Sequence, residues 1–458
     1  MLTITRATRI VVDESTERDG DLVLRDGVVS AGRPPGSTDA VVDGHLNETL
    51  DASGCVVTPG LVNAHHHLLQ SAFRTLPDTR GVAMKDWLPR MAAAYARTGV
   101  DAELAHAAAS VGVAEGLLCG VTTVADHHLT WPGSRSTDGR NTDGGSAGFS
   151  DSAVSDSVAI AAATADAARS LGGRLVFVRG SARDDPQEAA VSTEAIVHAL
   201  LPRTADGMLQ LAVGPAGVHS DSRETFELLA GIAARYGLRR RTQANEQVDV
   251  AIALETYGKR PIDLLEDWGW LEPGVTLAHL CDVTGDEIRR LAASGITATH
   301  APGCDLPMGW GIAPVAALRA AGIAVGLGTS GGGSNDAGHL LSDARLAMQV
   351  APLVGPPISA REALGMATAG SATGLGRPEL GSLRPGSAAD LCLWDVSGVA
   401  DAGVADTVAG LLWANPGRRP KHVVVAGRVV VRDYELVNAD EGELVARLVA
   451  RVPRGSTQ

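Results

Sequence analysis

Two kinds of segment alternate along the middle of the chain. Short runs rich in Val, Leu, Ile and Ala, bounded by Gly or Pro, are typical of buried strands. Longer segments with an apolar residue every three or four positions are typical of amphipathic helices. The predicted strands are 55–64, 121–126, 174–180, 209–215, 238–245, 275–280, 296–300 and 323–329. The predicted helices include 102–118, 158–170, 223–236, 285–294 and 337–350.

This alternation predicts an α/β fold built on a (β/α)₈ TIM-like barrel, because eight strand–helix units occupy roughly 300 residues. Enzymes with this fold carry their chemistry at the carboxyl ends of the strands. Polar residues stand at those ends here, namely His65, His67, His127, His128, Arg179, Glu246, His279, His300 and Ser330. A structural role explains any one of them easily. The same placement on so many strands favours a functional site.

The two ends of the chain have a different pattern from the middle. Residues 1–57 contain short segments rich in Val, Ile and Thr, with Gly and Asp at the turns, and residues 381–458 have the same texture. Ala426-Gly427 is a predicted hairpin turn. We therefore expect both ends to meet in one small β-sandwich beside a catalytic barrel formed by residues 58–380.

One segment interrupts the barrel pattern. Residues 131–157 are rich in Gly, Ser and Asp. We expect a flexible loop after the second strand, on the face that carries the polar strand ends. Such a loop is either a disordered insertion or a lid over the site, and the composition leaves both open.

Composition and charge exclude several classes of protein. The formal net charge of −14 argues against a nucleic-acid-binding surface and against binding to anionic membranes. No apolar run is long enough to span a bilayer, and the N-terminal residues lack the features of a signal peptide. The five cysteines are scattered and form no C-x-x-C pair, which favours a reduced, cytoplasmic setting.

The segment 62–70, VNAHHHLLQ, carries the strongest signal for chemistry. Side chains alternate between faces along a strand, so His65 and His67 point the same way and His66 points the other way. Two imidazoles that converge from one strand end are a good pair of metal ligands. A chance cluster of His residues in a loop, or three buried, hydrogen-bonded histidines, would show the same sequence pattern.

Two further residues are candidates for acid–base chemistry. Glu246 follows the fifth predicted strand, where a carboxylate facing a metal-bound water could carry its proton. It could also be a surface residue at a helix start, because Gln247 and Asp249 are polar as well. His279 ends the apolar sixth strand, where it is either a satisfied core residue or a residue that binds a metal or orients water.

Several motifs together resemble the amidohydrolase superfamily. The first is TPGLVNAHHHLLQSAFRTLP at 58–77, which is similar to the first-strand signature of that superfamily. Further matches are DWL at 86–88, GVTTVADHH at 120–128, VRGS at 178–181, LAHL at 277–280, DLPMGWGIAPV at 305–315 and GGSND at 332–336. The match covers nearly the whole chain from about residue 50. Within the superfamily the chain resembles the triazine hydrolase and 8-oxoguanine deaminase branch.

The resemblance implies a fold, a cofactor and roles for particular residues. The fold is a (β/α)₈ barrel beside a β-sandwich built from both termini, with one catalytic zinc ion per chain. His65 and His67 are the implied first-strand ligands. His279 contacts the metal or orients its water, and Glu246 is the implied proton shuttle. Family members commonly form homodimers or larger homo-oligomers, and we expect the same here.

The chain departs from the family pattern at two ligand positions. The strand-five pattern His-Thr-His is Arg241-Thr242-Gln243 here, so Gln243 stands where a His ligand is expected. Ser330 replaces the Asp that usually ends strand eight. An amide oxygen and a hydroxyl are weaker zinc ligands than imidazole and carboxylate. Loss of the Asp also removes a base that helps to ionise the water.

A zinc site of reduced strength is the expectation that remains. Three His ligands and a water can still form a working site. We therefore expect His65, His67 and His279 to hold the metal, with Gln243 as a poor fourth ligand. The alternative is a site that no longer binds a metal.

The branch acts on electron-poor nitrogen heteroaromatics, so the resemblance implies a purine-, pterin- or triazine-like substrate. Water would add to a ring carbon, and ammonia, an amine or a halide would leave. The candidate substrate-binding residues are Gln70, Trp87, His128, Arg179 and Trp310. Arg179 could hold a ring carbonyl or carboxylate, or form a salt bridge at the rim. The two Trp side chains could stack on a ring or simply pack.

Three hypotheses about function follow. The first is a zinc-dependent hydrolase or deaminase of heteroaromatics. The second is a metal-independent enzyme of the same fold that uses Glu246 and His279 as acid and base for a non-hydrolytic reaction. The third is a non-catalytic small-molecule binding protein. The retained acid and histidines favour an enzyme, whereas Gln243 and Ser330 keep the second hypothesis open.

Overall fold

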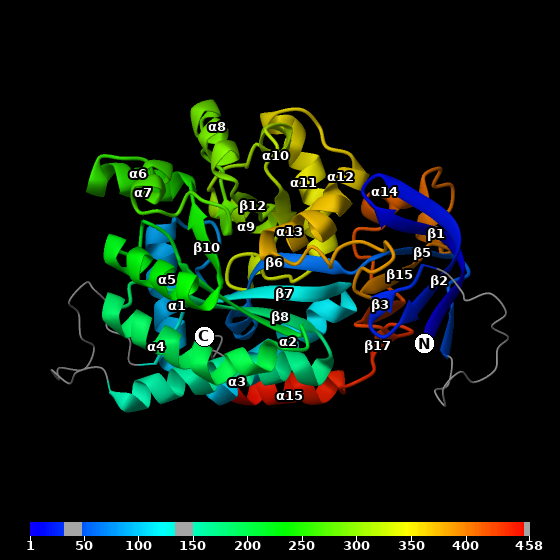
Figure 1. The fold of residues 1–458 in the computed structure, drawn as a ribbon, viewed down its shortest axis with the longest axis horizontal. Helices are drawn as coiled ribbons and strands as arrows, with labels where there is room; N and C mark the ends of the chain where they lie inside the picture. The colour runs from blue at the N-terminus through cyan, green and yellow to red at the C-terminus, as the bar shows by residue number, and fades with distance from the viewer. Residues whose placement is uncertain (32–47, 133–149, 453–458) are drawn as a thin grey trace.

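The chain, described by a computed structural model over residues 1–31, 48–132 and 150–452, is organised by two sheets that lie side by side (Figure 1). The larger unit is a parallel sheet whose strands follow one another in chain order. They are β6 (Leu61–His67), β7 (Val121–His128), β8 (Arg174–Ser181), β9 (Leu209–Pro215), β10 (Arg239–Ala244), β11 (Val275–His279), β12 (Thr297–His300), β13 (Val325–Leu327) and β14 (Ser330–Gly331).

The last strands close this sheet into a barrel. β13 pairs with β12, and β14, three residues further along the chain, pairs with β6. Between them the N–H of Thr329 donates to the carbonyl oxygen of His65 at 3.0 Å. The predicted (β/α)₈ barrel is therefore confirmed, with its eighth strand divided between β13 and β14.

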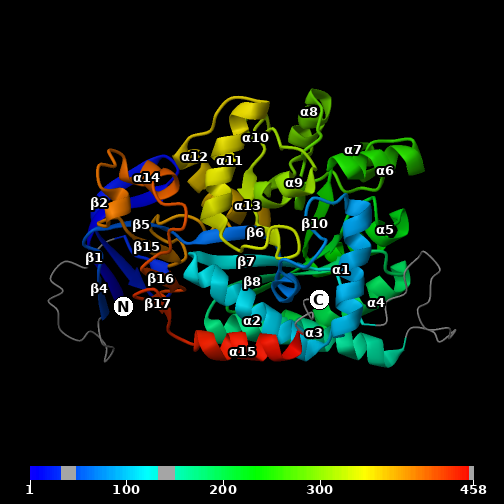
Figure 2. The same cartoon turned by 180° about the vertical axis from the view of Figure 1, so that it is seen from behind.

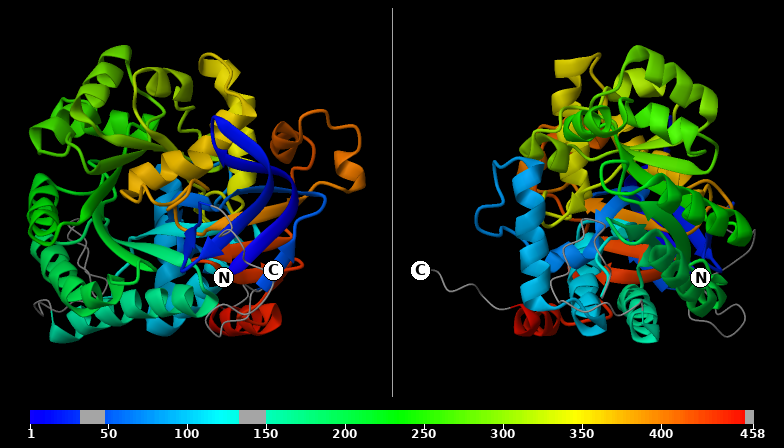
Figure 3. Two further views of the ribbon diagram at one scale, coloured as in Figure 1. Left: turned by 45° about the vertical axis from the view of Figure 1, so that its right-hand side comes forward. Right: turned by 90° about the vertical axis from the view of Figure 1, so that its left-hand side faces the viewer.

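Helices enclose the barrel, as Figure 3 shows most clearly on its left. α2 begins where the Asp101 side chain accepts a hydrogen bond from the N–H of Leu104, and α8 begins at a capping box of Thr284 and Glu287. The helices are α1 (Met84–Thr98), α2 (Ala102–Leu118), α3 (Asp151–Leu171), α4 (Pro186–Leu200), α5 (Arg223–Tyr236), α6 (Gln247–Tyr257), α7 (Pro261–Asp267), α8 (Gly285–Ser294), α9 (Pro302–Met308), α10 (Val315–Ala320), α11 (Leu340–Val354), α12 (Ala360–Gly365) and α13 (Ser371–Leu375).

The barrel strands bury both of their faces. Val62, Ala125 and Val178 belong to a cluster inside the barrel, whereas Val124 and Phe177 pack among the helices outside it. Every residue of β7 and β8 is buried. Their apolar runs are continuous for this reason, as is usual for parallel sheets.

The predicted strand 55–64 is two strands that belong to different sheets. β5 (Cys55–Pro59) lies in the second sheet and β6 lies in the barrel. At Gly60, between them, a Cβ atom would lie 2.3 Å from the Thr122 hydroxyl, so the close approach requires glycine. The prediction of one strand was wrong because a continuous apolar run does not mark a change of sheet.

The predicted loop 131–157 ends earlier than expected. α3 begins at Asp151, where the Ser150 side chain caps the N–H of Ala153. Residues 133–149 lie outside the described residues. The structure therefore tests neither role considered for this segment, a disordered insertion or a lid.

Both ends of the chain share the second sheet. β5 runs parallel to β1 from the N-terminal part and antiparallel to β15 from the C-terminal part. The predicted hairpin at Ala426-Gly427 is confirmed, because β16 and β17 pair across it. The strands are β1 (Leu2–Asp13), β2 (Thr16–Arg25), β3 (Val28–Val29), β4 (Glu48–Asp51), β5, β15 (Leu391–Asp395), β16 (His422–Val425), β17 (Arg428–Arg432) and β18 (Glu435–Leu436).

Two helices follow strands of this terminal β domain. α14 (Thr407–Trp413) precedes β16 and packs near α11, and α15 (Glu441–Arg451) lies along α2 of the barrel (Figure 2). None of the helices in the described ranges is long and apolar enough to cross a membrane.

A buried ion pair joins the barrel to the terminal β domain. Arg174, at the start of β8, donates from Nε to one carboxylate oxygen of Asp390 at 2.7 Å and from Nη2 to the other at 3.0 Å. Asp390 also accepts a hydrogen bond from the N–H of Ala426 at 2.7 Å. Removal of one partner leaves the other charge buried and unpaired, which is costly.

Asp390→Asn is therefore expected to lower the free energy of unfolding by about 3 kcal/mol, because the Arg174 guanidinium loses its counter-charge while it stays buried. Urea denaturation measures the change. Glu227→Gln, which breaks the exposed pair of Arg223 and Glu227 on α5, is the control and should cost less than about 0.5 kcal/mol. Equal costs for the two variants would contradict the structural role of the buried pair.

Candidate active site

Four histidine side chains gather at the carboxyl ends of three barrel strands. His65 and His67 come from β6, His127 from β7 and His279 from β11. The ring centroid of His65 lies 4.9 Å from that of His67, 5.3 Å from that of His279 and 5.8 Å from that of His127. His66 faces another way, and its Nδ1 lies 2.9 Å from the Thr329 hydroxyl.

Two of these imidazoles have features of metal ligands. Nδ1 of His67 donates to the carbonyl oxygen of His127 at 2.7 Å, which leaves Nε2 of His67 without the proton. Nε2 of His65 is buried and has no hydrogen-bond partner within the described ranges. Burial lowers the pKa of both rings, that of His67 to about 4. Both are therefore neutral at pH 7, which is the form that binds metals.

Gln243, near the end of β10, and Glu246, two residues beyond that strand, both approach His279. The Gln243 side-chain oxygen lies 3.0 Å from Nε2 of His279, and a Glu246 carboxylate oxygen lies 3.6 Å from the same nitrogen. Neither Glu246 oxygen has a hydrogen-bond partner among the residues described. Burial raises the pKa of Glu246 to about 7, against the lowering effect of His279 and His219. A carboxyl group with this pKa can accept and release a proton near neutral pH.

Asp305 on α9 contacts the ring nitrogen of His279 that lies away from Gln243. Its Oδ1 lies 2.6 Å from Nδ1 of His279, and its Oδ2 lies 3.6 Å from Nδ1 of His300. Burial alone would lower the pKa of His279, but the charges of Asp305 and Glu246 raise it. Asp305 was not among the predicted site residues, although it opens the motif DLPMGWGIAPV. The contact joins residues 26 positions apart, which the local pattern does not reveal.

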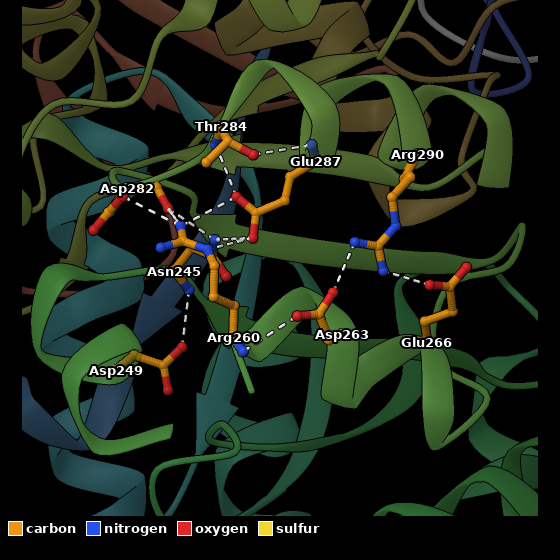
Figure 4. Close-up of polar contacts among 9 residues, drawn as sticks. All are labelled: Asn245, Asp249, Arg260, Asp263, Glu266, Asp282, Thr284, Glu287 and Arg290. Atoms are coloured by element: carbon orange, nitrogen blue, oxygen red, sulfur yellow. Dashed lines mark hydrogen bonds and ion pairs between the residues drawn. The ribbon is translucent and has the colours of Figure 1, made fainter. Parts of the chain in front are cut away.

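Polar contacts fix the backbone just before Glu246 (Figure 4). Asn245 has a left-handed φ of 56°, a conformation that is uncommon for residues other than glycine. Its N–H donates to Asp249 at 2.9 Å, and its side-chain amide donates to the carbonyl oxygen of Asp282 at 2.8 Å. The other Asp249 oxygen lies 3.1 Å from Nδ1 of His219. Asn245 thereby ties the end of strand five to the segment after strand six.

An ion-pair network supports this tie from the helix side (Figure 4). Arg260 donates to Glu287 at 2.8 Å and to the carbonyl oxygen of Asp282 at 2.7 Å. Thr284 and Glu287 cap α8 reciprocally. Arg290 lies further out and pairs with Asp263 of α7. The network holds together the segments that follow β10 and β11.

Ser330, the altered position on strand eight, lies beside the cluster with a left-handed φ of 52°. Its backbone pairs with His66 in the register of β14 and β6. Its hydroxyl lies 3.4 Å from that of Ser334. The structure therefore directs this side chain toward the following loop.

Gln70 and Trp87 both hold the loop after strand eight. The Gln70 side-chain oxygen accepts from the N–H of Gly333 at 3.0 Å, and the indole N–H of Trp87 donates to the carbonyl oxygen of Gly333 at 3.1 Å. Trp310 differs, because its ring stands at 88° to that of His279 with the centroids 5.2 Å apart. Of these three predicted substrate contacts, only Trp310 touches the histidine cluster directly.

His128 and Arg179 lie on the helix side of the strands. The Arg179 guanidinium pairs with Asp184 at 3.0 Å, donates to Ser192 of α4 at 2.7 Å and lies 4.8 Å from the centre of the Trp131 ring. The His128 ring is 4.6 Å from that of Trp131. Both side chains therefore pack on the helix side of the strands, away from the histidine cluster, and the substrate-binding role predicted for them stays a prediction.

His127, rather than its neighbour, faces the cluster. Its ring is stacked 5.9 Å from that of His67, and its Nε2 donates to the carbonyl oxygen of Gly214 at 2.8 Å. The sequence does not tell His127 from His128, because β7 is buried on both faces and its apolar pattern carries no sign of which face is inside.

The donor set at the cluster fits a divalent metal in part. His65 and His67 offer neutral imidazoles, and Gln243 offers an amide oxygen, which is a weaker ligand. In the described parts of the chain, no three His, Cys, Asp or Glu side chains are arranged to hold a metal ion. Nε2 of His279 is occupied by its contact with Gln243. A third ligand would require that contact to open.

A comparison with protein families decides where the chain belongs. The model of the family described as "Amidohydrolase family" matches residues 56–430. The chain belongs to the amidohydrolase family. The resemblance inferred from its motifs is therefore confirmed, as is the prediction of an amidohydrolase-type enzyme. Membership also favours an enzyme over the non-catalytic binding protein that was considered.

Relatives within the amidohydrolase family cover nearly the whole chain. The chain is 32% identical over 449 residues to 8-oxoguanine deaminase of Pseudomonas aeruginosa, with 93% of each chain covered. It is 30% identical to isoxanthopterin deaminase of an unknown prokaryotic organism, with 88% of this chain and 86% of the other covered.

A solved structure of the family shares the fold at a similar level. It is atrazine chlorohydrolase TrzN from Arthrobacter aurescens TC1 complexed with zinc. The TM-score is 0.86 at 34% identity, and the match covers 99% of this chain and all of that one. Both the barrel and the terminal β domain are therefore features of this family.

His128 provides a test of the placement of β7 in this amidohydrolase. Burial lowers the pKa of His128 to about 4, so it stays neutral in the folded chain. The unfolded chain takes up a proton on this residue below about pH 6.5, and stability falls as the pH falls. We therefore compare the free energy of unfolding of the natural chain with that of His128→Gln. From about pH 7.5 to about pH 5.5, the difference between them should shrink by about 1.4 kcal/mol.

Urea unfolding at the two pH values measures this effect. His198→Gln, which removes an exposed imidazole from α4, is the matched control. If the difference in free energy of unfolding between the natural chain and His128→Gln stays constant with pH, His128 is not buried as a neutral ring.

Proposed function

We propose that this amidohydrolase displaces an amino group, or a similar leaving group, from a nitrogen heteroaromatic by hydrolysis. The observation that carries the proposal is Glu246, a fully buried carboxyl group with a pKa of about 7 that lies 3.6 Å from Nε2 of His279. Relatives that match almost the full length support the substrate class, since they are deaminases of 8-oxoguanine and of isoxanthopterin.

In the proposed reaction, the chain moves one proton between water and the leaving group. Glu246 accepts a proton from the water that adds to the ring carbon, and then gives it to the departing nitrogen, which leaves as ammonia. The oxygen stays on the ring. His279, held by Asp305 at 2.6 Å, positions the reacting water beside Glu246. Trp310 stands against His279 and offers an apolar surface for a flat ring.

We infer that a zinc ion would be held by His65 and His67, with Gln243 as a weak third ligand. When bound, zinc would lower the pKa of its water and make hydroxide available near neutral pH. The Nε2 of His65, which has no partner among the described residues, and the Nε2 of His67, opposite its donating Nδ1, support this position. The zinc complex of a 34% identical relative supports the choice of metal.

One observation favours a second candidate function. Nε2 of His279 contacts Gln243 and Glu246, and Nδ1 contacts Asp305, so both nitrogens already have polar neighbours in the protein. In a metal-independent enzyme of the same fold, Glu246 and His279 would then act as base and acid. The metal content of the purified protein separates this candidate from the zinc hydrolase.

Glu246→Gln should lower kcat/KM for release of ammonia by at least about 100-fold, because the amide keeps the shape of the carboxyl group but carries no proton between water and leaving group. The assay follows ammonia from amino-substituted purines, pterins and triazines. Glu443→Gln on α15, where the side chain is 70% exposed, is the control. Unchanged turnover in Glu246→Gln would rule out the proposed role of this residue.

Gln243→His should increase the zinc that remains bound after dialysis against a chelator, because an imidazole binds zinc more strongly than an amide oxygen. Elemental mass spectrometry gives the number of zinc ions per chain. Gln210→His, on β9 and hydrogen-bonded to the carbonyl oxygen of Leu375, is a matched substitution away from the cluster. If Gln243→His and Gln210→His retain equal zinc, Gln243 does not lie at a ligand position.

A further inference from the structure

Arg241 is a buried cation inside the barrel, next to the first-strand histidines. It lies on β10, and its side chain shares a face with Gln243 because the two are two residues apart. Its Nη2 donates to the carbonyl oxygen of Ala64, the residue before His65. Nε and Nη1 are buried without a hydrogen-bond partner in the described residues. The side chain therefore crosses from β10 toward β6 with two of its three nitrogens unsatisfied.

No carboxylate neutralises Arg241 within the described chain, in contrast to other buried arginines. Arg174 pairs with Asp390, and Arg179 pairs with Asp184. The neighbouring Arg240 points to the other face and pairs with Glu272. An unpaired buried charge is costly, so this one is a notable exception.

Arg241 remains charged at neutral pH. A guanidinium group keeps its proton at neutral pH even inside a protein. The Nη2 of Arg241 bonds to the backbone of Ala64, the residue before His65. The positive charge therefore lies next to the strand end that carries His65 and His67, the residues that would bind a metal.

We propose that Arg241 sets the metal affinity of the site by weakening the binding of a divalent cation at His65 and His67. Like charges repel more strongly in a barrel interior than in water, because little solvent screens them. The same strand that loses an imidazole ligand at Gln243 thus also places a fixed cation at Arg241. Both changes lower the affinity for a dication.

The inference rests on the metal position given under the proposed function, but not on the reaction. Removal of the charge should strengthen zinc binding even with Gln243 unchanged. Measuring the zinc affinity needs no substrate, because zinc alone is the probe.

The experiment compares zinc dissociation constants, measured by competition with a chromophoric chelator on the full-length chain. Arg241→Gln should bind zinc at least about tenfold more tightly than the natural chain, which corresponds to about 1.4 kcal/mol. Arg241→Met, an apolar side chain of similar reach, should show the same change. Arg241→Lys keeps the charge and should stay within about threefold of the natural chain.

Arg240→Gln is the matched control. It removes one positive charge from the adjacent residue, which faces the helices and pairs with Glu272. It should leave the zinc dissociation constant unchanged. Thermal unfolding shows whether each variant is folded. If Arg241→Gln does not fold, the comparison uses Arg241→Met instead.

The outcomes separate the inference from the proposed function. Equal zinc affinity in the natural chain, Arg241→Gln and Arg241→Met would overturn the inference. An equal gain in Arg240→Gln would overturn it too, because net charge alone would then explain the effect. Tighter zinc binding without ammonia release from any heteroaromatic would support the inference and count against the proposed function.

Discussion

The exclusion of water from the carboxyl end of the barrel is the constraint on which the site depends. β6 and β14 close the sheet, and the groups inside it lose contact with solvent. Each polar group there must find a partner or change its protonation state. Glu246 changes its protonation, because its carboxylate has no hydrogen-bond partner among the described residues and its pKa is near 7. His65 and His67 are likewise held in their neutral form.

The surrounding structure supports the groups that lack partners. Asp305 fixes the orientation of His279 through a 2.6 Å contact. Asn245, in a left-handed conformation, is held by Asp249 and Asp282 so that the following residue, Glu246, stays beside His279. The acid and the imidazole come from neighbouring strands, but their alignment depends on side chains of helices outside the barrel. A site of this kind is preorganised by its second layer of contacts.

The charges at the site give this member of the amidohydrolase family a distinctive character. Among the described residues, Arg241 has no carboxylate partner and bonds to the backbone just before His65, and Gln243 occupies a position where the family pattern has an imidazole. Both features act in the same direction on a bound cation. Glu246 and His279, the residues proposed to carry protons, are both present. In the proposed mechanism, the proton-carrying pair is thus kept while the proposed metal position has changed.

The sequence by itself determined the barrel, the terminal β domain, the family and the pairing of His65 with His67. Those features depend on periodicity and on local motifs, which are written in consecutive residues. Only the tertiary structure decided that His127 faces the cluster while His128 and Arg179 pack against helices. A strand buried on both faces has no polar side to mark its orientation. Asp305 likewise reaches His279 only through the fold, because burial and pairing depend on distant parts of the chain.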